Sequence, residues 1–425
     1  MRRSEPGAVR PRLTPAAALG AVTAAVAVLV GGCGGPAGPA ALVVHFRAPA
    51  GHFAQLLAGP ATGDLGGAMA AHGGLLAVGD HLGGPGQAGL VEVFSLSGGR
   101  LRLQAVLQPP GPAPHQGFGS SVAVGNGIIL VGADQVGANG NVPGEAYVYL
   151  HGRLGWSLAQ TLRAGDGSAG DAFGASASLV GGTAVVGAPG HASGAGAAYV
   201  FREEGGRWHR VAELAPGPAA GTSAFGTSVA LAGDRLAVGA PYEYGGSGSV
   251  HLFSSAGEGW SVGPVLVLAR DQERADGRLG TSVAWWGDEL AAGAPQAGLD
   301  HSGRVVIFAR AGRRWVRSVV LSGTGHSQSF GQSVAVAGGR LAVGAPQGFG
   351  PGQAFVFVPG STPPAREWSA VELRGAGMTA KLASYDGFGT SVAFMPGSVV
   401  VGAPDQGPAG VLYVRPAAAA PPRRH

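Results

Sequence analysis

The stretch Ala224–Ala230 (AFGTSVA), followed by Leu236–Pro241 (LAVGAP), decides the fold of this chain. Both phrases recur together, with small changes, seven times along the sequence. The glycine of the second phrase lies at positions 79, 132, 187, 239, 293, 344 and 402, so successive copies are 51 to 58 residues apart. A period near fifty residues is typical of one blade of a β-propeller, and it is too long for a leucine-rich or short helical repeat.

A full repeat contains four short runs with the composition of strands, which in the fourth copy cover residues 227–231, 235–239, 249–253 and 260–268. Four strands make one propeller blade. A glycine-containing tight turn, Ala232–Asp234 in this copy, joins the first two runs, because glycine accepts a positive φ without steric cost. We therefore predict an all-β fold, a seven-bladed propeller of four-stranded antiparallel blades.

Side-chain size changes in step with the repeat. The first two runs are rich in Gly, Ala, Ser and Val, whereas a tryptophan opens the fourth run at positions 156, 208, 260, 315 and 368. Blades converge at the ring axis, so inner strands need small residues and outer strands need bulky ones. We expect these tryptophans to fill the widening wedges between blades, where large rings contribute strongly to stability.

The seventh repeat ends at Val411–Val414, before Pro416, and it lacks a fourth run. Upstream of the first repeat, Ala54–Leu57 resembles the fourth run Ala159–Leu162 of the second repeat. We predict that this N-terminal strand completes the last blade and closes the ring, which removes the exposed strand edges. The apolar run Leu42–Phe46 is an alternative candidate for the same role.

The N-terminus has the pattern of an export signal. Four arginines, at positions 2, 3, 10 and 12, precede an apolar run over Ala16–Val30, and small residues lead into Cys33. The sequence Val30–Cys33 resembles a bacterial lipobox, and Cys33 is the sole cysteine of the chain. We predict an exported lipoprotein of the bacterial cell envelope, held to the membrane by a lipid on Cys33. The alternatives are a secreted protein and a weak membrane anchor formed by the apolar run.

These features divide the chain into a signal peptide (1–32), a lipidated cysteine with a flexible linker (33–50), the propeller (51–415) and a disordered Ala/Pro tail (416–425). Removing residues 1–32 takes away four arginines and one glutamate, so the formal charge falls from +4 to +1. No blade carries a run of basic residues interleaved with aromatic ones, and we therefore predict no nucleic-acid partner.

The repeats resemble the FG-GAP repeat family, which builds the seven-bladed propeller at the N-terminus of integrin α subunits and occurs in many bacterial envelope proteins. The resemblance covers about residues 53 to 414 and is carried by Phe-Gly at 118, 173, 225, 330 and 388 and Leu-Gly at 279, each paired with its Gly-Ala-Pro or Gly-Ala-Asp. Calcium-binding members carry an acidic loop between the first two strands of a blade. This chain has only tight turns there, which supply too few oxygen ligands for calcium. We predict no bound metal and no cofactor.

Apparent catalytic signals follow the repeat instead of standing out from it. Serines at 121, 176, 228, 282, 333 and 391 share one phase, whereas an active site needs a single nucleophile. We interpret them as small polar groups inside the inner strands. Asp171 precedes Phe173-Gly174 much as Asp64 precedes Leu65-Gly66, which favours turn capping over catalysis. The twelve histidines lack paired metal-ligand spacing, and we predict no catalytic residue.

The remaining candidates lie in connections that do not repeat. Loops between second and third strands, and those between blades, are expected on one face of the ring. Aromatic and charged residues in otherwise small-residue loops are candidate ligand contacts: Tyr242, Glu243, Tyr244, Asp271, Glu273, Arg274, Asp300, His301 and Phe349.

Two classes of function follow. The first is a non-enzymatic propeller, envelope-anchored or secreted, that binds protein or glycan partners, with adhesion as the family-level analogy. The second is an envelope enzyme acting on polysaccharide with acids from the ligand-face loops. Two non-repeating carboxylates converging near the axis with shifted pKa values would favour the enzyme.

Overall fold

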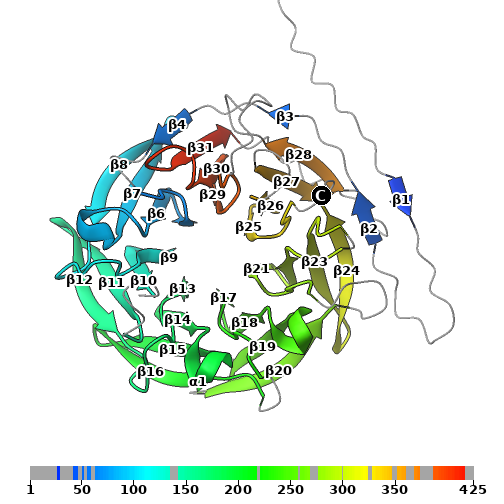
Figure 1. The fold of residues 1–425 in the computed structure, drawn as a ribbon, viewed down its shortest axis with the longest axis horizontal. Helices are drawn as coiled ribbons and strands as arrows, with labels where there is room; N and C mark the ends of the chain where they lie inside the picture. Colours follow the sequence, from blue (N-terminus) through cyan, green and yellow to red (C-terminus); the bar gives the residue numbers. More distant parts are fainter. Residues whose placement is uncertain are drawn as a thin grey trace, which may run out of the picture.

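The chain forms a ring of seven antiparallel sheets (Figure 1). The computed structural model describes residues 26–28, 42–45, 50–51, 55–58, 63–134, 142–217, 221–256, 259–268, 276–298, 300–323, 328–346, 352–359, 368–373 and 386–416. Six blades have four consecutive strands in sequence order from the axis outward, and the seventh takes its outermost strand from the N-terminal part of the chain, so the predicted seven-bladed propeller is confirmed.

Blades 1 to 4 contain the following strands. Blade 1 has β5 (Ala68–His72), β6 (Leu75–Asp80), β7 (Leu90–Ser97) and β8 (Arg100–Leu107); blade 2 has β9 (Phe118–Gly125), β10 (Ile128–Ala133), β11 (Glu145–Gly152) and β12 (Gly155–Leu162); blade 3 has β13 (Ser176–Val180), β14 (Thr183–Ala188), β15 (Ala197–Glu204) and β16 (Arg207–Leu214); blade 4 has β17 (Ser228–Ala232), β18 (Arg235–Ala240), β19 (Ser249–Ala256) and β20 (Gly259–Val267).

Blades 5 to 7 complete the ring. Blade 5 has β21 (Ser282–Trp286), β22 (Glu289–Ala294), β23 (Arg304–Ala311) and β24 (Arg314–Ser322); blade 6 has β25 (Ser333–Ala337), β26 (Arg340–Ala345), β27 (Gln353–Pro359) and β28 (Trp368–Leu373); blade 7 has β29 (Val392–Met395), β30 (Ser398–Ala403) and β31 (Val411–Pro416). In every blade two residues separate the first strand from the second, as at Gly233, whose φ is +62°.

The N-terminal segment supplies the missing outer strand of blade 7. β4 (Gln55–Ala58) pairs antiparallel with β31, with Leu57 opposite Leu412, which confirms the predicted closure (Figure 1). The alternative candidate, residues 42–46, is wrong for this role. Its strand β2 (Leu42–His45) runs parallel to β24 on the outer edge of blade 5 instead. Two short strands lie beside the ring as well: β1 (Val26–Val28) pairs with β2, and β3 (Ala50–Gly51) pairs with β28.

The predicted lipidation site Cys33 lies outside the described residues, as do residues 417–425 of the tail. Across the described part of the chain, no helix combines the length and the apolar character needed to cross a membrane.

The Phe-Gly dipeptide forms the joint between successive blades. In blade 4 the N–H of Phe225 donates to the carbonyl of Ala195 in blade 3 (3.1 Å), and the N–H of Gly226 donates to Gly239 within blade 4 (3.0 Å). The carbonyl of Gly226 accepts the hydroxyl of Ser176 from blade 3 (2.7 Å). Gly226 has a φ of +93°, in the left-handed region that favours glycine.

The repeated serines are the hydrogen-bond donors of this joint, which confirms their interpretation as polar groups of inner strands. Each donates to the Phe-Gly or Leu-Gly glycine of the next blade: Ser121 to Gly174, Ser176 to Gly226, Ser228 to Gly280, Ser282 to Gly331, Ser333 to Gly389 and Ser391 to Gly66, over 2.5 to 2.9 Å. Blade 1 has Ala68 at this position and cannot make the bond.

The glycine of each Gly-Ala-Pro phrase is required by close packing at the same joint. A Cβ atom placed on Gly187 would overlap the carbonyl oxygen of Gly226, and equivalent overlaps occur at the six other copies. The backbones of neighbouring blades therefore meet where neither residue has a side chain.

Hydrophobic clusters fill the space between blades. Trp208 is 4 % exposed and belongs to a cluster built from blades 2 and 3, with Leu162 and Phe173 among its members. The side chain of Gln160 in blade 2 also bonds both the N–H and the carbonyl of Trp208 (2.9 and 2.8 Å). The equivalent residues Trp156 and Trp260 are half-buried against the corresponding clusters of their blades.

The buried position of Trp208 predicts the cost of emptying it. We expect Trp208→Ala to lower the free energy of unfolding by about 3 to 5 kcal/mol, the usual range for removing a large aromatic side chain from a packed core. Denaturant melts measure the change, with Leu154→Ala at a fully exposed position as the control. A melt of the Trp208 variant that overlays the parent would contradict the wedge-filling role.

The pairing of β4 with β31 predicts a sharp boundary in N-terminal truncation. A chain that begins at residue 52 keeps β4, whereas a chain that begins at residue 59 lacks it and exposes the edge of β31. We expect the shorter chain to melt several degrees lower and to aggregate more readily, because an unpaired edge strand recruits other chains. Equal melting temperatures for the two chains would show that β4 does not stabilise the ring.

Candidate functional site

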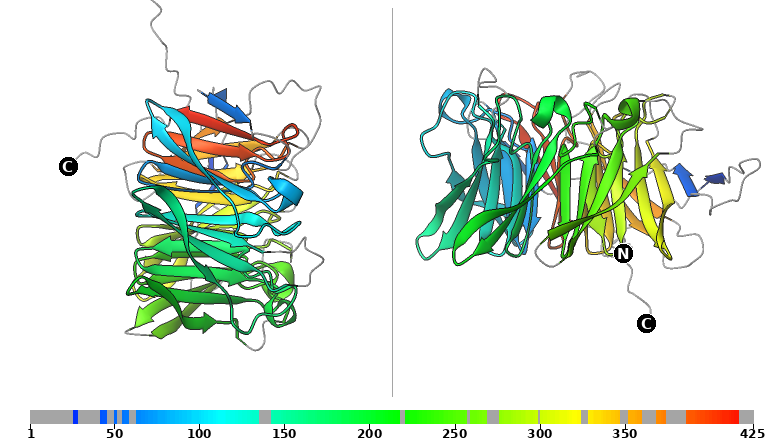
Figure 2. Two further views of the ribbon diagram at one scale, coloured as in Figure 1. Left: turned by 90° about the vertical axis from the view of Figure 1, so that its left-hand side faces the viewer. Right: turned by 90° about the horizontal axis from the view of Figure 1, so that it is seen from below.

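The connections between second and third strands lie on one side of the ring, which we call the loop face (Figure 2). They carry η1 (Pro85–Gln87), α1 (His191–Gly194) and η2 (Glu243–Gly246). The blade-to-blade connections meet them there: the N–H of Arg278 donates to the carbonyl of Gly246 (2.9 Å). Both classes of loop therefore share one face, as expected from the repeat.

The structure separates the nine sequence candidates into three groups. Tyr242 and Tyr244 of blade 4 are each 49 % exposed, whereas Glu243 between them is 7 % exposed and points inward. Asp300 and His301 of blade 5 are half-buried and bonded within their own loop, to the N–H of Ser302 and the carbonyl of Gln296 (both 3.2 Å). The remaining four candidates, Asp271, Glu273, Arg274 and Phe349, lie outside the described residues.

Glu243 is held beneath its loop by the third strand of its own blade. Its Oε2 atom lies 2.6 Å from Nε2 of His251 and also accepts the hydroxyl of Ser249. Burial alone would raise the pKa of Glu243, but the hydrogen bonds from His251 and Ser249 outweigh it and hold that pKa below its usual value. The carboxylate is therefore stabilised in its ionised form.

A pocket of about 670 Å³ opens beside these residues. Its walls come from the blade 3 to blade 4 connection, from the loop of η2, and from strands β19 and β20. Glu243 and His251 are its buried polar lining, and the half-exposed Tyr242 and Tyr244 stand at its edge. Val262, which is 78 % exposed, adds apolar surface from β20.

Strand register identifies the matching place in blade 3. There Phe201 pairs with Arg210 and Tyr199 pairs with Glu213. In blade 4, Phe253 pairs with Val262 and His251 pairs with Val265. Valines thus stand in blade 4 where blade 3 has an arginine and a glutamate.

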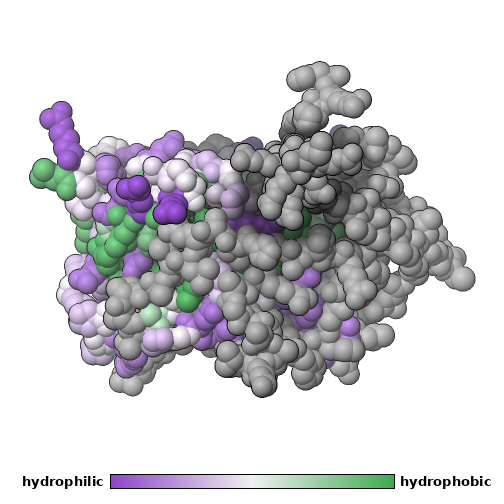
Figure 3. All heavy atoms as spheres, turned by 90° about the horizontal axis from the view of Figure 1, so that it is seen from above, coloured by the Kyte–Doolittle hydropathy of each residue, from purple (hydrophilic) through white to green (hydrophobic). Residues whose placement is uncertain are grey.

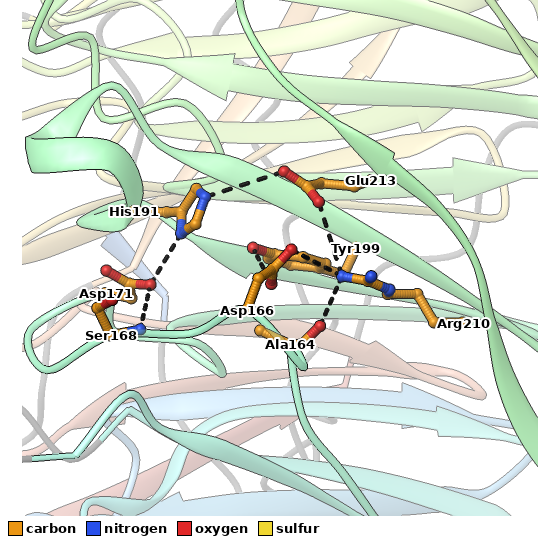
Figure 4. A network of polar contacts seen from close by, with 8 residues as sticks. All are labelled: Ala164, Asp166, Ser168, Asp171, His191, Tyr199, Arg210 and Glu213. Atoms are coloured by element: carbon orange, nitrogen blue, oxygen red, sulfur yellow. Dashed lines mark hydrogen bonds and ion pairs between the residues drawn. The ribbon is translucent and has the colours of Figure 1, made fainter.

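In blade 3 these charged side chains join into a network across the slot, by which we mean the space between the fourth strand of a blade and the connection that enters the blade from the preceding one (Figure 4). Nη1 of Arg210 lies 2.9 Å from Asp166, 3.6 Å from Glu213 and 2.6 Å from the carbonyl of Ala164. The hydroxyl of Tyr199 donates to Asp166 over 3.1 Å. Partial burial opposes ionisation of Asp166, but the hydrogen bond from Arg210 prevails and lowers the pKa of Asp166 to about 2.

His191 of α1 extends the network from Glu213 to Asp171. Its Nδ1 lies 2.8 Å from Asp171, and its Nε2 lies 3.9 Å from Glu213. Burial and the neighbouring Asp166 raise the pKa of Glu213. The slot is therefore bridged by charged side chains in blade 3 and left open in blade 4.

A second group of acids lies at the seam between blades 7 and 1. Asp80, which is 2 % exposed, accepts the N–H of Asp64 (2.8 Å), while Asp64 accepts the N–H of Leu82 (3.0 Å) and contacts His81. Burial and the adjacent Asp64 carboxyl raise the pKa of Asp80 to about 7, although the bond from the Asp64 N–H acts in the opposite direction. The pair is not repeated in the other blades, where alanine takes the place of Asp80.

The interpretation of Asp171 as a turn cap is confirmed, whereas the Asp64 side chain bonds Leu82 in the segment after β6 and not its own turn. Asp171 accepts the N–H of Ser168 (2.8 Å), and Asp386 does the same for Phe388 in blade 7 (3.0 Å). In the described part of the chain no three His, Cys, Asp or Glu side chains gather in an arrangement that could hold a metal ion.

Sequence reasoning missed Asp80, His251 and the valines of β20. Asp80 and His81 replace the Ala-Pro of the repeat phrase, and His251 occupies a place where three other blades have a tyrosine. Both departures were visible in the repeat alignment. Val262 and Val265 gave no such signal, because their meaning depends on the strand register.

The FG-GAP repeat family matches the chain over residues 101–149, 156–201 and 208–253. Each matched stretch runs from the fourth strand of one blade to the third strand of the next, so each contains one complete inter-blade joint. The matches and the seven-bladed ring together support an FG-GAP propeller. Among curated proteins no relative matches the chain.

The raised pKa of Asp80 predicts a pH-dependent stability. Below about pH 4 Asp80 is protonated in both the folded and the unfolded chain, so its contribution is complete. Between pH 4 and pH 7 the unfolded chain releases this proton first, and the contribution is lost as the pH rises through the folded value. Asp80→Asn cannot ionise, so its free energy of unfolding does not fall in this way as the pH rises. We therefore expect the difference in free energy of unfolding, variant minus parent, to be more favourable to the variant at pH 8 than at pH 5.

Denaturant melts of parent and variant at the two pH values test this expectation. Asp288→Asn, at a side chain that is 93 % exposed, is the matched control. An equal difference between parent and Asp80→Asn at both pH values would show that Asp80 does not titrate in this range.

Proposed function

We propose that this protein is a non-enzymatic propeller, anchored to the cell envelope or secreted, that binds protein or glycan partners through its loop face. The FG-GAP propeller fold is compatible with binding and with adhesion. The observation that carries the proposal is the blade 4 pocket, which departs from the repeat and has the half-exposed rings of Tyr242 and Tyr244 at its edge.

The physical setting favours recognition. Loops that bind partners are commonly held by a rigid scaffold, and exposed aromatic side chains are frequent anchors of interfaces. Here the scaffold is a closed ring joined by backbone contacts, so the loop carrying Tyr242 and Tyr244 is presented without the cost of ordering a mobile domain.

The alternative, an envelope enzyme, draws support from the unrepeated pair Asp64 and Asp80 with its raised pKa. Burial argues against it. Asp80 is 2 % exposed and Asp64 is 7 % exposed, and each carboxyl accepts a backbone N–H from the other's segment: Asp80 from Asp64, and Asp64 from Leu82. A buried carboxyl that is hydrogen-bonded in this way stabilises the backbone and is poorly placed to reach a glycosidic bond.

The outer rim offers a rival contact surface. On the left-hand rim, where Figure 1 places β8, Figure 3 shows apolar surface beside hydrophilic surface. Leu103 and Val106 of β8 are 52 % and 45 % exposed. Scattered apolar residues of this kind are normal on a protein surface, so the pocket remains the stronger candidate.

Affinity capture from native envelope extracts tests the proposal with matched baits. We expect the propeller without its first 33 residues to retain a partner that Tyr242→Ala/Tyr244→Ala fails to retain. Leu103→Ala/Val106→Ala, which removes exposed apolar side chains from the outer rim, should capture as the parent does. Loss of the partner from the rim variant alone would move the binding surface to β8 and contradict the proposal.

Export and anchoring are proposed on the N-terminal sequence. We expect Cys33→Ser to move the protein from the membrane fraction to the soluble secreted or periplasmic fraction, because acyl chains supply most of the membrane affinity of a lipoprotein. Fractionation with and without detergent measures the change. Detergent-dependent fractionation that persists in the variant would show that the apolar run 16–30 is itself the anchor.

A further inference from the structure

We propose that the blade 4 pocket binds a neutral saccharide unit. This inference rests on the proposed binding function and narrows it to one class of ligand. A pocket of about 670 Å³ is within the range of small-molecule sites, about 300 to 1,000 Å³.

The pocket differs from the matching place in blade 3 at two positions of the fourth strand. In blade 3, Arg210 and Glu213 extend from β16 and close the slot together with Asp166 (Figure 4). Val262 and Val265 of β20 occupy the same positions opposite the third strand and are too short to bridge it. Blades 1 and 2 also have uncharged residues at these positions, Leu103 with Val106 and Leu158 with Thr161, so among these four blades the charged bridge belongs to blade 3 alone. What distinguishes the blade 4 pocket is its lining by the Tyr242–Tyr244 loop and His251.

The rings at the edge suit the apolar face of a sugar. Tyr242 and Tyr244 are both half exposed, and Arg278 lies 5.2 Å from the ring centroid of Tyr242. A tyrosine offers a flat apolar surface and a polar hydroxyl, a combination that matches a ring with C–H groups on its faces and hydroxyls at its edge. Tyr244 has a φ of +53°, which a bulky residue rarely adopts, so the loop imposes this backbone conformation against the intrinsic preference of the residue.

The lining beneath the rings selects a neutral ligand rich in hydrogen-bond donors. The carboxylate of Glu243 can only accept hydrogen bonds, and sugar hydroxyls are donors. Its negative charge is already shared with His251, which lies 2.6 Å away. Besides the two tyrosines, the ionisable side chains among the described residues lining this pocket are Glu243 and His251, which are paired with each other, so this lining offers a charged ligand no further countercharge except Arg278 at the edge.

Calorimetric titration with defined probes tests the inference. The probes are neutral hexasaccharides of glucose, mannose and galactose, with hexagalacturonate and a hexa-arginine peptide as charged comparators. We expect the full chain to bind at least one neutral hexasaccharide more tightly than either charged probe. Tyr244→Ala should weaken this binding by about tenfold or more, the usual scale for an aromatic anchor. Tyr244→Phe, which keeps the ring, should retain most of it.

The second test fills the blade 4 pocket with the charged side chains found at the same positions in blade 3. Val262→Arg/Val265→Glu places the blade 3 side chains in the open slot, and we expect it to abolish saccharide binding. The matched control makes the same change in blade 2, where Leu158 pairs with Tyr149 and Thr161 pairs with Tyr147. We expect Leu158→Arg/Thr161→Glu to bind as the parent does. Circular dichroism and melting temperatures establish that each variant is folded.

Three outcomes would overturn the inference: no neutral probe binds at millimolar concentration, only a charged probe binds, or both the plugged and the Tyr244→Ala chains bind as the parent does. These results are separable from failure of the proposed function. A partner that the parent captures and Tyr242→Ala/Tyr244→Ala does not, with no saccharide binding, would leave the binding function standing and assign the pocket to a protein ligand.

Discussion

The whole ring depends on one contact, the approach of a Phe-Gly turn to the glycine of the preceding blade. The carbonyl of Gly226 lies where a Cβ atom on Gly187 would be, and it accepts the hydroxyl of Ser176. Such proximity is possible only where both backbones lack side chains, and Gly226 must also adopt a positive φ. Glycine is thus required on both sides of every joint. This requirement explains why the repeat is so visible in the sequence while the loops between its fixed points vary.

That distinction also separates what the sequence predicted from what it did not. Blade number and strand order follow from a constraint that acts on every repeat, and closure by β4 followed from the likeness of Ala54–Leu57 to the fourth run of the second repeat, so pattern alone was sufficient. The candidate site was predicted from the sequence only in part. Tyr242 and Tyr244 stood out among small residues and are half exposed, whereas the neighbouring Glu243 turns inward because its partner His251 lies eight residues further along, on the third strand. Such pairing is set by strand register, which composition does not reveal.

The pocket was even harder to predict from the sequence, because it too depends on strand register. Val262 and Val265 are ordinary strand residues until they are aligned with Arg210 and Glu213, and the alignment crosses a bulge in both blades. The exchange of a charged bridge for valines has a small energetic effect, because Arg210, Asp166 and Glu213 are each more than a third exposed and exposed ion pairs contribute little. A blade can therefore open its slot without weakening the joints that hold the ring.

The seam between blades 7 and 1 poses a different problem, because its two sides are far apart in sequence. Ser391 bonds Gly66 across 325 positions, and the turn at Gly66 has no preceding blade in the chain to position it. Asp80 supplies a local substitute by accepting the N–H of Asp64, which fixes the backbone just before Leu65. Leu65 in turn donates to Ala409 of blade 7 over 3.3 Å. The buried acid pair thus ties the turn before β5 to the segment after β6 within blade 1, next to the residues Leu65 and Gly66 that contact blade 7.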